Sequence, residues 1–249
     1  MAHPNLECPE LVQSVPMKFL IAGLLLSLPL LADEISTSAG TVKITPIQHA
    51  SFMLQAGGKV IYVDPAQGSF DGRPKADLIL ITDIHGDHMA PKIVDGLRKS
   101  GTVILAPEAV AKTITDAKTI RNGETQQVGD WKIDAVPMYN VKRGPSEGKF
   151  YHDKGRGNGY VLTYGGKRIY ISGDTEGISE MRALKNIDVA FICMNLPYTM
   201  TPEEAAEAVR AFHPKVVYPY HYKGSDPKAF EKGLEGSGVE VRLRNWYPG

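Results

Sequence analysis

The chain has 249 residues, of which 43% are apolar and 22% are charged, ordinary values for a globular protein. This composition excludes a long disordered, collagen-like or coiled-coil chain. The 28 lysines and arginines balance 28 aspartates and glutamates, so the sequence also lacks the excess positive charge that a general nucleic-acid binder needs.

The first 32 residues are expected to form a secretory signal peptide. Met17 is followed by a lysine, an apolar run over residues 19–31 and the small residue Ala32, which is the usual order of regions in such signals. A membrane-spanning helix needs roughly 20 apolar residues, and this shorter run is interrupted by Pro29. A buried N-terminal helix is the alternative. We therefore expect cleavage after Ala32 and no stable membrane anchor in the mature protein.

Residues 1–16 do not fit a signal peptide, because they place glutamates where positive charge is needed. We expect the natural start at Met17 and one folded domain over residues 33–249, located in the periplasm or secreted. Removal of the leader would also remove Cys8 and leave Cys193 as the only cysteine. No intrachain disulfide could then form, even in an oxidising compartment.

Beyond the leader, the chain alternates between strand-like and helix-like segments. Glycine pairs at 57–58 and 165–166 predict two hairpins, and Thr201 followed by Pro202 and Glu204 predicts a capped helix start. The alternation favours one α/β domain. The predicted strands cover residues 41–47, 51–56, 59–64, 77–82, 131–138, 159–164, 167–172, 187–194, 216–220 and 239–244. The predicted helices cover residues 91–99, 107–115, 202–212 and 227–234.

Metal-binding residue types cluster directly after the fourth predicted strand. Asp83 and His85 are spaced to lie on one face of a strand, and Gly86 frees the backbone to turn Asp87 and His88 toward a second centre. Imidazole and carboxylate ligands together suit Zn²⁺, Fe or Mn²⁺. A polar loop with solvated histidines is the alternative. Ligand sites of α/β proteins collect at the carboxyl ends of strands, so this position favours a metal site.

Three further candidates lie next to later strands. His152 is in the loop before a predicted strand, whereas Asp174 and His221 each come directly after one. A site built on one rim of a sandwich requires this recurrence of ligand-type residues at strand ends.

The complete pattern resembles that of the metallo-β-lactamase-fold hydrolases. The motif of these hydrolases is H-x-H-x-D-H after a strand, followed later by a histidine, an aspartate in a G-D-T sequence and a final histidine. The residues of this chain that match the motif are His85, Asp87, His88, His152, Asp174 and His221. Asp64, in VIYVDP, matches an aspartate on a neighbouring strand. The resemblance covers about residues 42–245 and looks closest to the branch with ascorbate-phosphate lactonases, on the segments QHASFML, GNGYVL, SGDTEG and NLPYTM. It implies a four-layer αββα sandwich.

The resemblance also implies a hydrolase with two divalent metal ions, zinc being favoured. One ion would be held by Asp83, His85 and His152, the other by Asp87, His88 and His221, with Asp174 bridging. Two ions about 3.5–4 Å apart can share a hydroxide and stabilise an oxyanion. A metal-bridging hydroxide would attack an ester, lactone or phosphodiester of a small molecule, with Asp87 and Asp174 as the catalytic carboxylates.

Asp83 departs from the family motif, which has a histidine at this position. A carboxylate ligand would lower the net positive charge of the first metal ion and make Mn²⁺ or Fe more acceptable. Alternatively, Asp83 orients His85 or His152 without touching metal. The position in the motif favours direct ligation.

Other residues carry weaker expectations. Tyr139, Asn140 and Tyr198 follow strands and are expected to contact substrate, with ordinary loop packing as the alternative. His49 either faces the site or forms a structural hydrogen bond, and Cys193 is expected to be a buried, inert thiol. Five cations between residues 140 and 158 either bind an anionic substrate group or are solvated; they are Lys142, Arg143, Lys149, Lys154 and Arg156.

Three alternative functions remain open, one of which is a metal-binding scaffold without turnover. A true β-lactamase would cleave the amide of a β-lactam ring, and a non-hydrolytic di-iron redox protein could use the same fold. A nucleic-acid partner is not expected, because the charge is balanced and export would separate the protein from cytoplasmic RNA.

Overall fold

The structure, a computed structural model, describes Met1 and residues 33–248. The expected signal peptide lies outside these residues, apart from Met1. Fourteen strands form two seven-stranded sheets. The first sheet contains, in spatial order, β1 (Asp33–Thr37), β2 (Gly40–Gln48), β3 (Ser51–Ala56), β4 (Lys59–Val63), β5 (Leu78–Leu80), β6 (Val103–Ala106) and β7 (Lys118–Thr119). The second contains β8 (Thr125–Val128), β9 (Trp131–Met138), β10 (Gly157–Tyr164), β11 (Lys167–Ile171), β12 (Val189–Cys193), β13 (Val216–Tyr220) and β14 (Glu240–Val241).

Both sheets have the same mixed plan. Strands β1 to β4 pair antiparallel and β4 to β7 pair parallel. In the second sheet, β8 to β11 pair antiparallel and β11 to β14 pair parallel. The hairpins expected at residues 57–58 and 165–166 are confirmed as the β3–β4 and β10–β11 turns. Each sheet therefore brings the carboxyl ends of several parallel strands to one edge.

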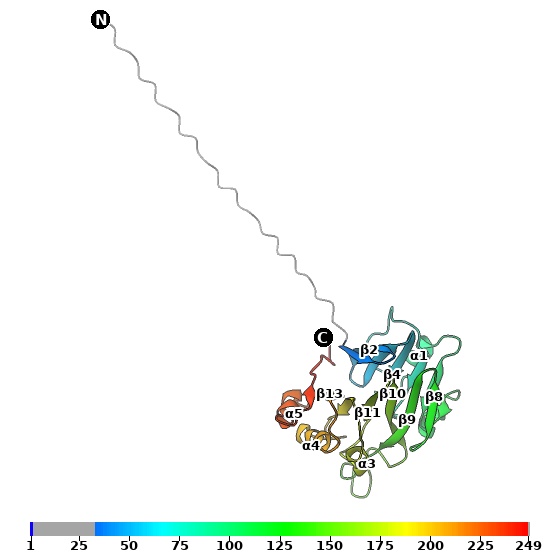
Figure 1. Cartoon of the computed structure of the whole chain (residues 1–249). Coiled ribbons are helices and arrows are strands. Elements are labelled where there is room, and N and C mark those ends of the chain that lie inside the picture. Colours follow the sequence, from blue (N-terminus) through cyan, green and yellow to red (C-terminus); the bar gives the residue numbers. More distant parts are fainter. Residues whose placement is uncertain (2–32, 249) are drawn as a thin grey trace. The chain divides into compact units, whose positions relative to one another are not determined.

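Helices cover the outer faces of the two sheets, which gives the expected αββα sandwich. They are α1 (Pro91–Leu97), α2 (Glu108–Ala111), α3 (Ser179–Arg182), α4 (Pro202–Phe212) and α5 (Pro227–Gly233). Figure 1 shows α1 on the side of the first sheet and α4 with α5 on the side of the second. Among residues 33–248, no helix is long and apolar enough to cross a membrane.

Strand β4 shows how a continuously apolar strand is used in this fold. Ile61 and Val63 belong to the core that includes residues of both sheets, whereas Val60 and Tyr62 belong to a second core with α1 and α2. Because successive side chains point to opposite faces, both faces of the strand are buried.

The start of α4 follows the predicted capping pattern. The Thr201 hydroxyl accepts a hydrogen bond from the Glu204 main-chain N–H, and the Glu204 carboxylate accepts one from the Thr201 N–H. These reciprocal bonds satisfy two main-chain groups that a helix end leaves open. The helix then buries Val209 and Phe212 against the sheet.

Several short elements were not predicted, namely β1, β6, β7, β8 and α3. The expected helix over 107–115 is also shorter, since α2 covers only Glu108–Ala111. The expected strand over 77–82 shrinks to Leu78–Leu80. Its ladder ends there because the Thr82 main-chain N–H donates to the Asp64 carboxylate at 2.7 Å instead of to a neighbouring strand.

We predict that Phe191→Ala destabilises the domain strongly. The Phe191 ring is fully buried and stacks on Phe52 at 4.4 Å between ring centroids and on Tyr218 at 5.0 Å. Its loss should lower the free energy of unfolding by about 3–5 kcal/mol. Urea unfolding would measure this, with the exposed Thr41→Ala in β2 as a control expected to change stability by less than about 0.5 kcal/mol. A near-neutral Phe191→Ala would contradict the packing of the core.

Candidate metal centre

Titratable residues from both sheets meet at the edge where the parallel strands end. The segment after β5 supplies Asp83 to His88, the turn after β11 supplies Asp174, and His221 follows β13. The long loop between β9 and β10 adds His152. All the metal-site residues expected from the sequence are therefore brought together at one edge, as the topology of parallel strands requires.

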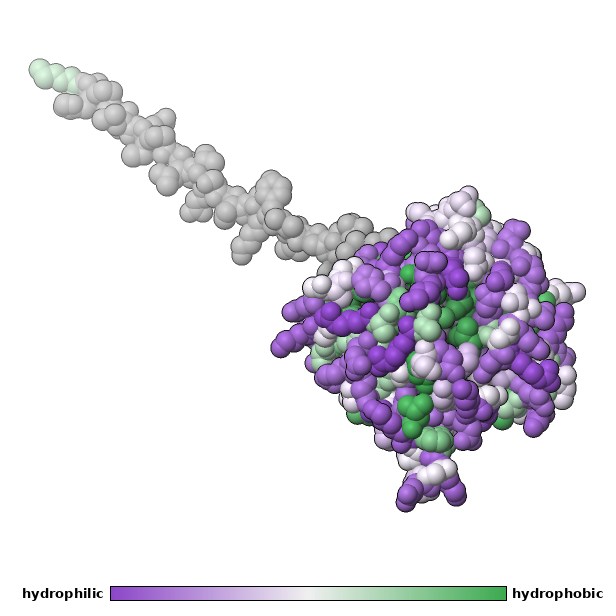
Figure 2. All heavy atoms as spheres, turned by 60° about the horizontal axis from the view of Figure 1, so that its bottom comes forward, coloured by the Kyte–Doolittle hydropathy of each residue, from purple (hydrophilic) through white to green (hydrophobic). Residues whose placement is uncertain are grey.

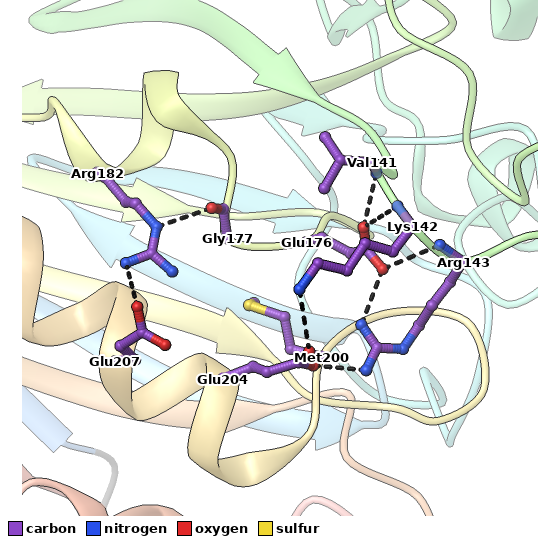
Figure 3. A pocket seen from close by; sticks show the side chains of 9 residues that line it. All are labelled: Val141, Lys142, Arg143, Glu176, Gly177, Arg182, Met200, Glu204 and Glu207. Carbon is purple, nitrogen blue, oxygen red and sulfur yellow. Dashed lines mark hydrogen bonds and ion pairs between the residues drawn. The ribbon is translucent and has the colours of Figure 1, made fainter.

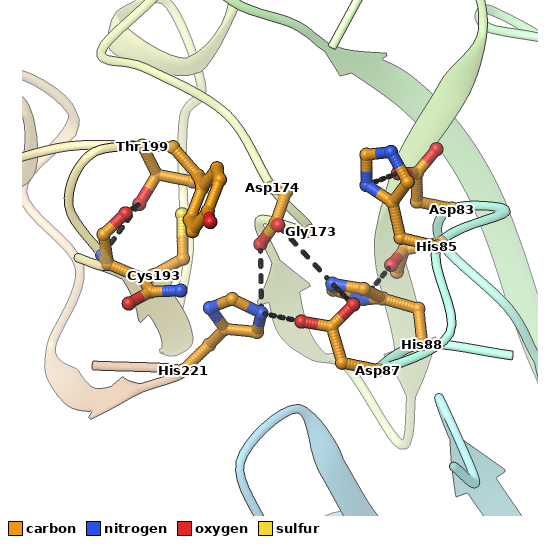
Figure 4. A network of polar contacts seen from close by, with 12 residues as sticks. Asp83, His85, Asp87, His88, Gly173, Asp174, Cys193, Thr199 and His221 are labelled. Atoms are coloured by element: carbon orange, nitrogen blue, oxygen red, sulfur yellow. Dashed lines mark hydrogen bonds and ion pairs between the residues drawn. The ribbon is translucent and has the colours of Figure 1, made fainter. Parts of the chain in front are cut away.

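Asp174 lies in the middle of the group (Figure 4). Its Oδ2 atom is 3.3 Å from Nε2 of His88 and 3.3 Å from Nε2 of His152, and its Oδ1 atom is 3.4 Å from Nε2 of His221. The side chain is only 4% exposed. One buried carboxylate thus faces three imidazoles that come from three different segments.

Two sets of ligand-type atoms lie on either side of Asp174. On one side, Oδ2 of Asp83 is 2.8 Å from Nδ1 of His85 and 3.9 Å from Nε2 of His152. On the other side, Asp87 places Oδ2 3.3 Å from Nε2 of His221 and Oδ1 3.9 Å from Nε2 of His88. Ligand atoms of a tetrahedral zinc site, each about 2.0–2.2 Å from the ion, are separated by similar distances.

Two buried atoms show that the residues fit a bound cation. Among the described residues, Nε2 of His88 and Oδ1 of Asp174 are buried without a hydrogen-bond partner, as is Nδ1 of His221 on the other side of its ring. Leaving such groups unpaired is unfavourable. Nε2 of His88 faces Oδ2 of Asp174, and Oδ1 of Asp174 faces Nε2 of His221, so a divalent ion bound among them would use the lone pairs of both orphaned atoms. Imidazole nitrogens and carboxylate oxygens are also the donor set that such ions select.

Neighbouring side chains fix which nitrogen two of these histidines direct inward. The Oδ1 atom of Asn140 accepts hydrogen bonds from Nδ1 of His152 at 2.6 Å and from its main-chain N–H at 2.8 Å. Likewise Nδ1 of His88 lies 2.8 Å from Oδ2 of Asp64. With Nδ1 protonated, Nε2 of each ring carries the lone pair that faces Asp174.

Neighbouring groups keep the two buried carboxylates of the site, Asp174 and Asp83, ionised. Burial alone would raise the pKa of Asp174, but without a bound ion the protonated forms of His221 and His88 outweigh it and hold the pKa well below its usual value. Burial also opposes ionisation of Asp83, yet its hydrogen bond with His85 and the nearby His88 and Arg156 lower its pKa to about 2. Both carboxylates are therefore ionised at neutral pH and available to a cation.

Asp83, the departure from the family motif, has a cationic partner. Arg156 donates from Nη2 to Oδ2 at 3.1 Å and from Nε to Oδ1 at 3.3 Å. The guanidinium offsets the negative charge that a carboxylate adds in place of a histidine. No feature of the sequence pattern pairs these two residues, which are 73 positions apart.

His49, for which two roles remained open, faces the site. Its Nε2 is 3.2 Å from Oδ2 of Asp87, its Nδ1 is 2.7 Å from the Tyr247 hydroxyl, and its ring lies 3.8 Å from that of His221. Three non-glycine residues around the site adopt positive φ, namely His49 (57°), Asp64 (44°) and His221 (48°). Such strained backbone recurs at functional sites.

The structure gives Asn140 and Tyr139 contacts other than the expected ones with substrate. Asn140 is 2% exposed, and beyond its bonds to His152 it donates from Nδ2 to the Tyr198 carbonyl at 2.8 Å. The Tyr139 hydroxyl donates to Glu180 at 2.9 Å, with Lys154 over its ring. Both residues thus hold the loop that carries His152. Of the three expected substrate contacts, Tyr198 alone lies on the cleft.

Glu176 is a residue of the site's surroundings that the sequence reasoning missed. Its buried carboxylate accepts hydrogen bonds from the main-chain N–H groups of Val141, Lys142 and Arg143 and from the Arg143 side chain (Figure 3). It thereby ties the turn that carries Asp174 to the loop that carries Asn140. The only feature of the sequence that could have pointed to Glu176 is its position two residues after Asp174.

A cleft of about 300 Å³ opens onto the candidate ligands. Its walls are formed by His85, Asp87, Tyr151, His152, Asp174 and Tyr198. Cys193 does not belong to this lining; it is buried as expected, and burial raises the pKa of its thiol to about 12.

Comparison with known proteins agrees with this geometry. The β-lactamase superfamily domain matches residues 43–221. A UPF0173 metal-dependent hydrolase of Thermococcus kodakarensis is 33% identical over 218 residues, which span 80% of this chain and 95% of that protein. The chain belongs to the metallo-β-lactamase superfamily. The prediction of a metal-dependent hydrolase of this superfamily is thus confirmed.

Solved structures of other metal-dependent hydrolases have the same fold as this chain. A candidate metal-dependent hydrolase from Parabacteroides distasonis has a TM-score of 0.83 at 44% identity, covering 87% of this chain and 99% of that one. Igni18, a metallo hydrolase from Ignicoccus hospitalis, has a TM-score of 0.68 at 26% identity, covering 82% and 94%. The predicted αββα fold is confirmed.

We predict that Asn140→Ala weakens zinc binding by the hydrolase about 10–100-fold, because the ring of His152 loses the acceptor that orients it. Competition with a zinc-sensitive chelator would measure the affinity, and circular dichroism would show that the fold is retained. Gln127→Ala is the matched control, since this amide bonds only within its own turn, to Gly129. Unchanged zinc affinity in Asn140→Ala would contradict an orienting role.

We also predict that Glu180→Gln flattens the acid dependence of stability. The Lys154 ammonium lowers the pKa of Glu180 to about 2. The ion pair therefore stabilises the folded state at pH values above the ordinary pKa of glutamate, and this stabilisation is lost as pH falls toward 2. Wild type should exceed the variant in Tm by up to about 2 °C at pH 6 and lose that advantage by pH 2. Thermal scans of metal-free protein would test this, with the exposed Glu203→Gln as control. A constant difference across this range would refute the ion pair.

Proposed function

We propose that this chain is an exported dinuclear metal-dependent hydrolase that cleaves an ester, lactone or phosphodiester bond of a small molecule. The observation that carries the proposal is the position of Asp174. Its two carboxylate oxygens face histidines of both candidate metal groups, at 3.3 Å and 3.4 Å. A carboxylate placed in this way suits two ions rather than one.

The bound ions, zinc being favoured, would polarise the scissile group, activate a water and stabilise the developing negative charge. Asp83, His85 and His152 would hold one ion, and Asp87, His88 and His221 the other. The chain's own residues keep these ligands in place. Asp64 and Asn140 fix two imidazoles, and Arg156 compensates the charge of Asp83.

Asp87 is suited to move a proton. Its side chain is 31% exposed and lines the cleft, so that substrate and solvent can reach it. His49 and His221 both approach its Oδ2 atom, at 3.2 Å and 3.3 Å. Burial opposes ionisation of Asp87, but these two contacts lower its pKa and keep the carboxylate ionised. The ionised group could orient a water at the site and relay its proton to a leaving group.

A small-molecule substrate fits the cleft better than a polymer. Its volume of about 300 Å³ is at the lower end of the range for small-ligand sites. Four of the five cations near the cleft are paired with carboxylates: Lys142 with Glu204, Arg143 with Glu176 and Glu204, Lys154 with Glu180, and Arg156 with Asp83. They do not offer the unpaired positive surface that phosphate backbones require.

Export is part of the proposal and rests on the sequence of residues 17–32. Expression of the full chain in a bacterial host, followed by fractionation and N-terminal sequencing, would test it. We expect a mature N-terminus at Asp33 in the periplasm or medium. Recovery of the chain in the cytoplasm with residues 1–16 intact would refute export.

We predict that His85→Ala and Asp174→Ala each lose metal and activity together. The wild type should bind two ions per chain by mass spectrometry of the metal content, and each variant fewer, with turnover reduced at least about 100-fold because the ion pair acts as a unit. A panel of chromogenic esters, lactones, phosphodiesters and nitrocefin, with defined Zn²⁺, Mn²⁺ or Fe loading, would identify the bond cleaved.

The control for these variants is His213→Ala. This histidine caps the end of α4 and bonds the Ser237 carbonyl, apart from the metal-site residues. It should keep both metal and turnover. Full turnover in a variant that has lost its metal would overturn the mechanism, and hydrolysis of nitrocefin alone would assign the chain to the β-lactamases.

A further inference from the structure

Large apolar side chains are exposed on two segments, each of which also contributes a tyrosine to the cleft. Of residues 33–248, the large hydrophobic side chains classed as exposed are Val141, Phe150, Leu196 and Tyr198, at 38–47%. Two belong to the loop between β9 and β10, and two belong to the segment between β12 and α4. Single exposed apolar groups are common on protein surfaces, but a concentration of them marks a binding site.

These two segments are continuous with the candidate metal centre. Tyr151 and Tyr198 line the cleft together with His85 and Asp87. Their rings meet edge to face at 5.0 Å between centroids. The hydrogen bond from Asn140 to the Tyr198 carbonyl fixes one segment against the other. A molecule whose scissile bond lies at the metal centre would therefore extend across aromatic and aliphatic side chains.

The cations near the cleft are largely paired. Figure 2 turns forward the side of the molecule where Figure 1 places α3, and it shows scattered green apolar side chains on a mostly purple face. The cations of the same loop are occupied: Arg143, Lys154 and Arg156 bond to Glu176, Glu180 and Asp83 at 2.8 Å, 2.9 Å and 3.1 Å. The cleft thus has aromatic rings beside its metal-site residues, and the positive charge nearby is largely paired.

We propose that the mouth of the cleft binds an apolar group of the substrate, such as a medium-length acyl chain, beside the bond that is cleaved. This inference rests on the proposed function and adds its substrate class. Tyr198 and Tyr151 form part of the cleft wall beside the metal-site residues, and Leu196 and Phe150 are exposed close to them along the chain. Burial of the chain against these side chains supplies affinity in proportion to the apolar area covered.

Binding of simple carboxylates to the zinc-loaded protein tests the proposal without turnover. Acetate and octanoate present the same head group to the ions and differ only in the chain. We expect octanoate to bind at least about tenfold more tightly than acetate in calorimetric titrations. Tyr198→Ser and Leu196→Ser should each lower this ratio about threefold or more, whereas Tyr198→Phe, which keeps the ring and removes the hydroxyl, should retain it.

Equal affinities for acetate and octanoate would overturn the proposal, as would an equal loss of the ratio in Tyr198→Phe and Tyr198→Ser. Sedimentation of the wild type with phosphatidylcholine vesicles, abolished by Leu196→Ser, would instead assign the surface to a membrane. A dimer lost in Leu196→Ser would assign it to a second copy of the chain.

Kinetics separate this inference from the proposed function. Faster hydrolysis of p-nitrophenyl octanoate than of the acetate, with the difference reduced in Tyr198→Ser, would support it. Rates that do not depend on chain length would overturn it and leave the hydrolase intact. Failure to cleave any substrate of the panel would overturn the proposed function itself.

Discussion

The buried carboxylate of Asp174 is the group on which the arrangement of the site depends. A carboxylate that is almost inaccessible to water must be matched by positive charge or by hydrogen-bond donors. Here the Nε2 atoms of three histidines lie 3.3–3.4 Å from its oxygens, and Nε2 of His88 and Oδ1 of Asp174 are among the buried polar atoms left without partners. Bound cations would satisfy these atoms, so the physical requirement of the buried charge and the chemistry of a metallohydrolase coincide.

Residues that hydrogen-bond to the candidate ligands hold those ligands in position. Asp64 and Asn140 each fix one imidazole, and Glu176 fastens the loop of Asn140 to the turn of Asp174 through main-chain hydrogen bonds. These partners come from strand ends and loops of both sheets. The sandwich therefore serves as a rigid frame that brings short, irregular segments into register at one edge.

The loop between β9 and β10 supplies residues both to the candidate metal centre and to the cleft beside it. The segment between β9 and β10 contributes His152 to the metal-site residues, Arg156 as the partner of Asp83, and Tyr151 to the wall of the cleft. Its cations are largely used for internal ion pairs, which leaves apolar side chains to face a ligand. A change in this loop could alter the substrate while the metal-site frame stays the same.

The ligand-type residues and the family were predictable from the sequence, because a D-x-H-x-D-H segment directly after an apolar strand concentrates ligand-type side chains where metal sites form. The two glycine-pair hairpins and the capped start of α4 were predictable as well, since they depend on neighbouring residues alone. The pairing of Asp83 with Arg156, the contact of His49 with Tyr247 and the use of Asn140 to orient His152 were not. Two of these contacts join residues 73 and 198 positions apart, and the third depends on how a long loop folds back. Sequence by itself thus determined which chemistry the chain carries, and only the tertiary structure decided which side chains hold it in place, because those partners are chosen by packing in space and not by spacing along the chain.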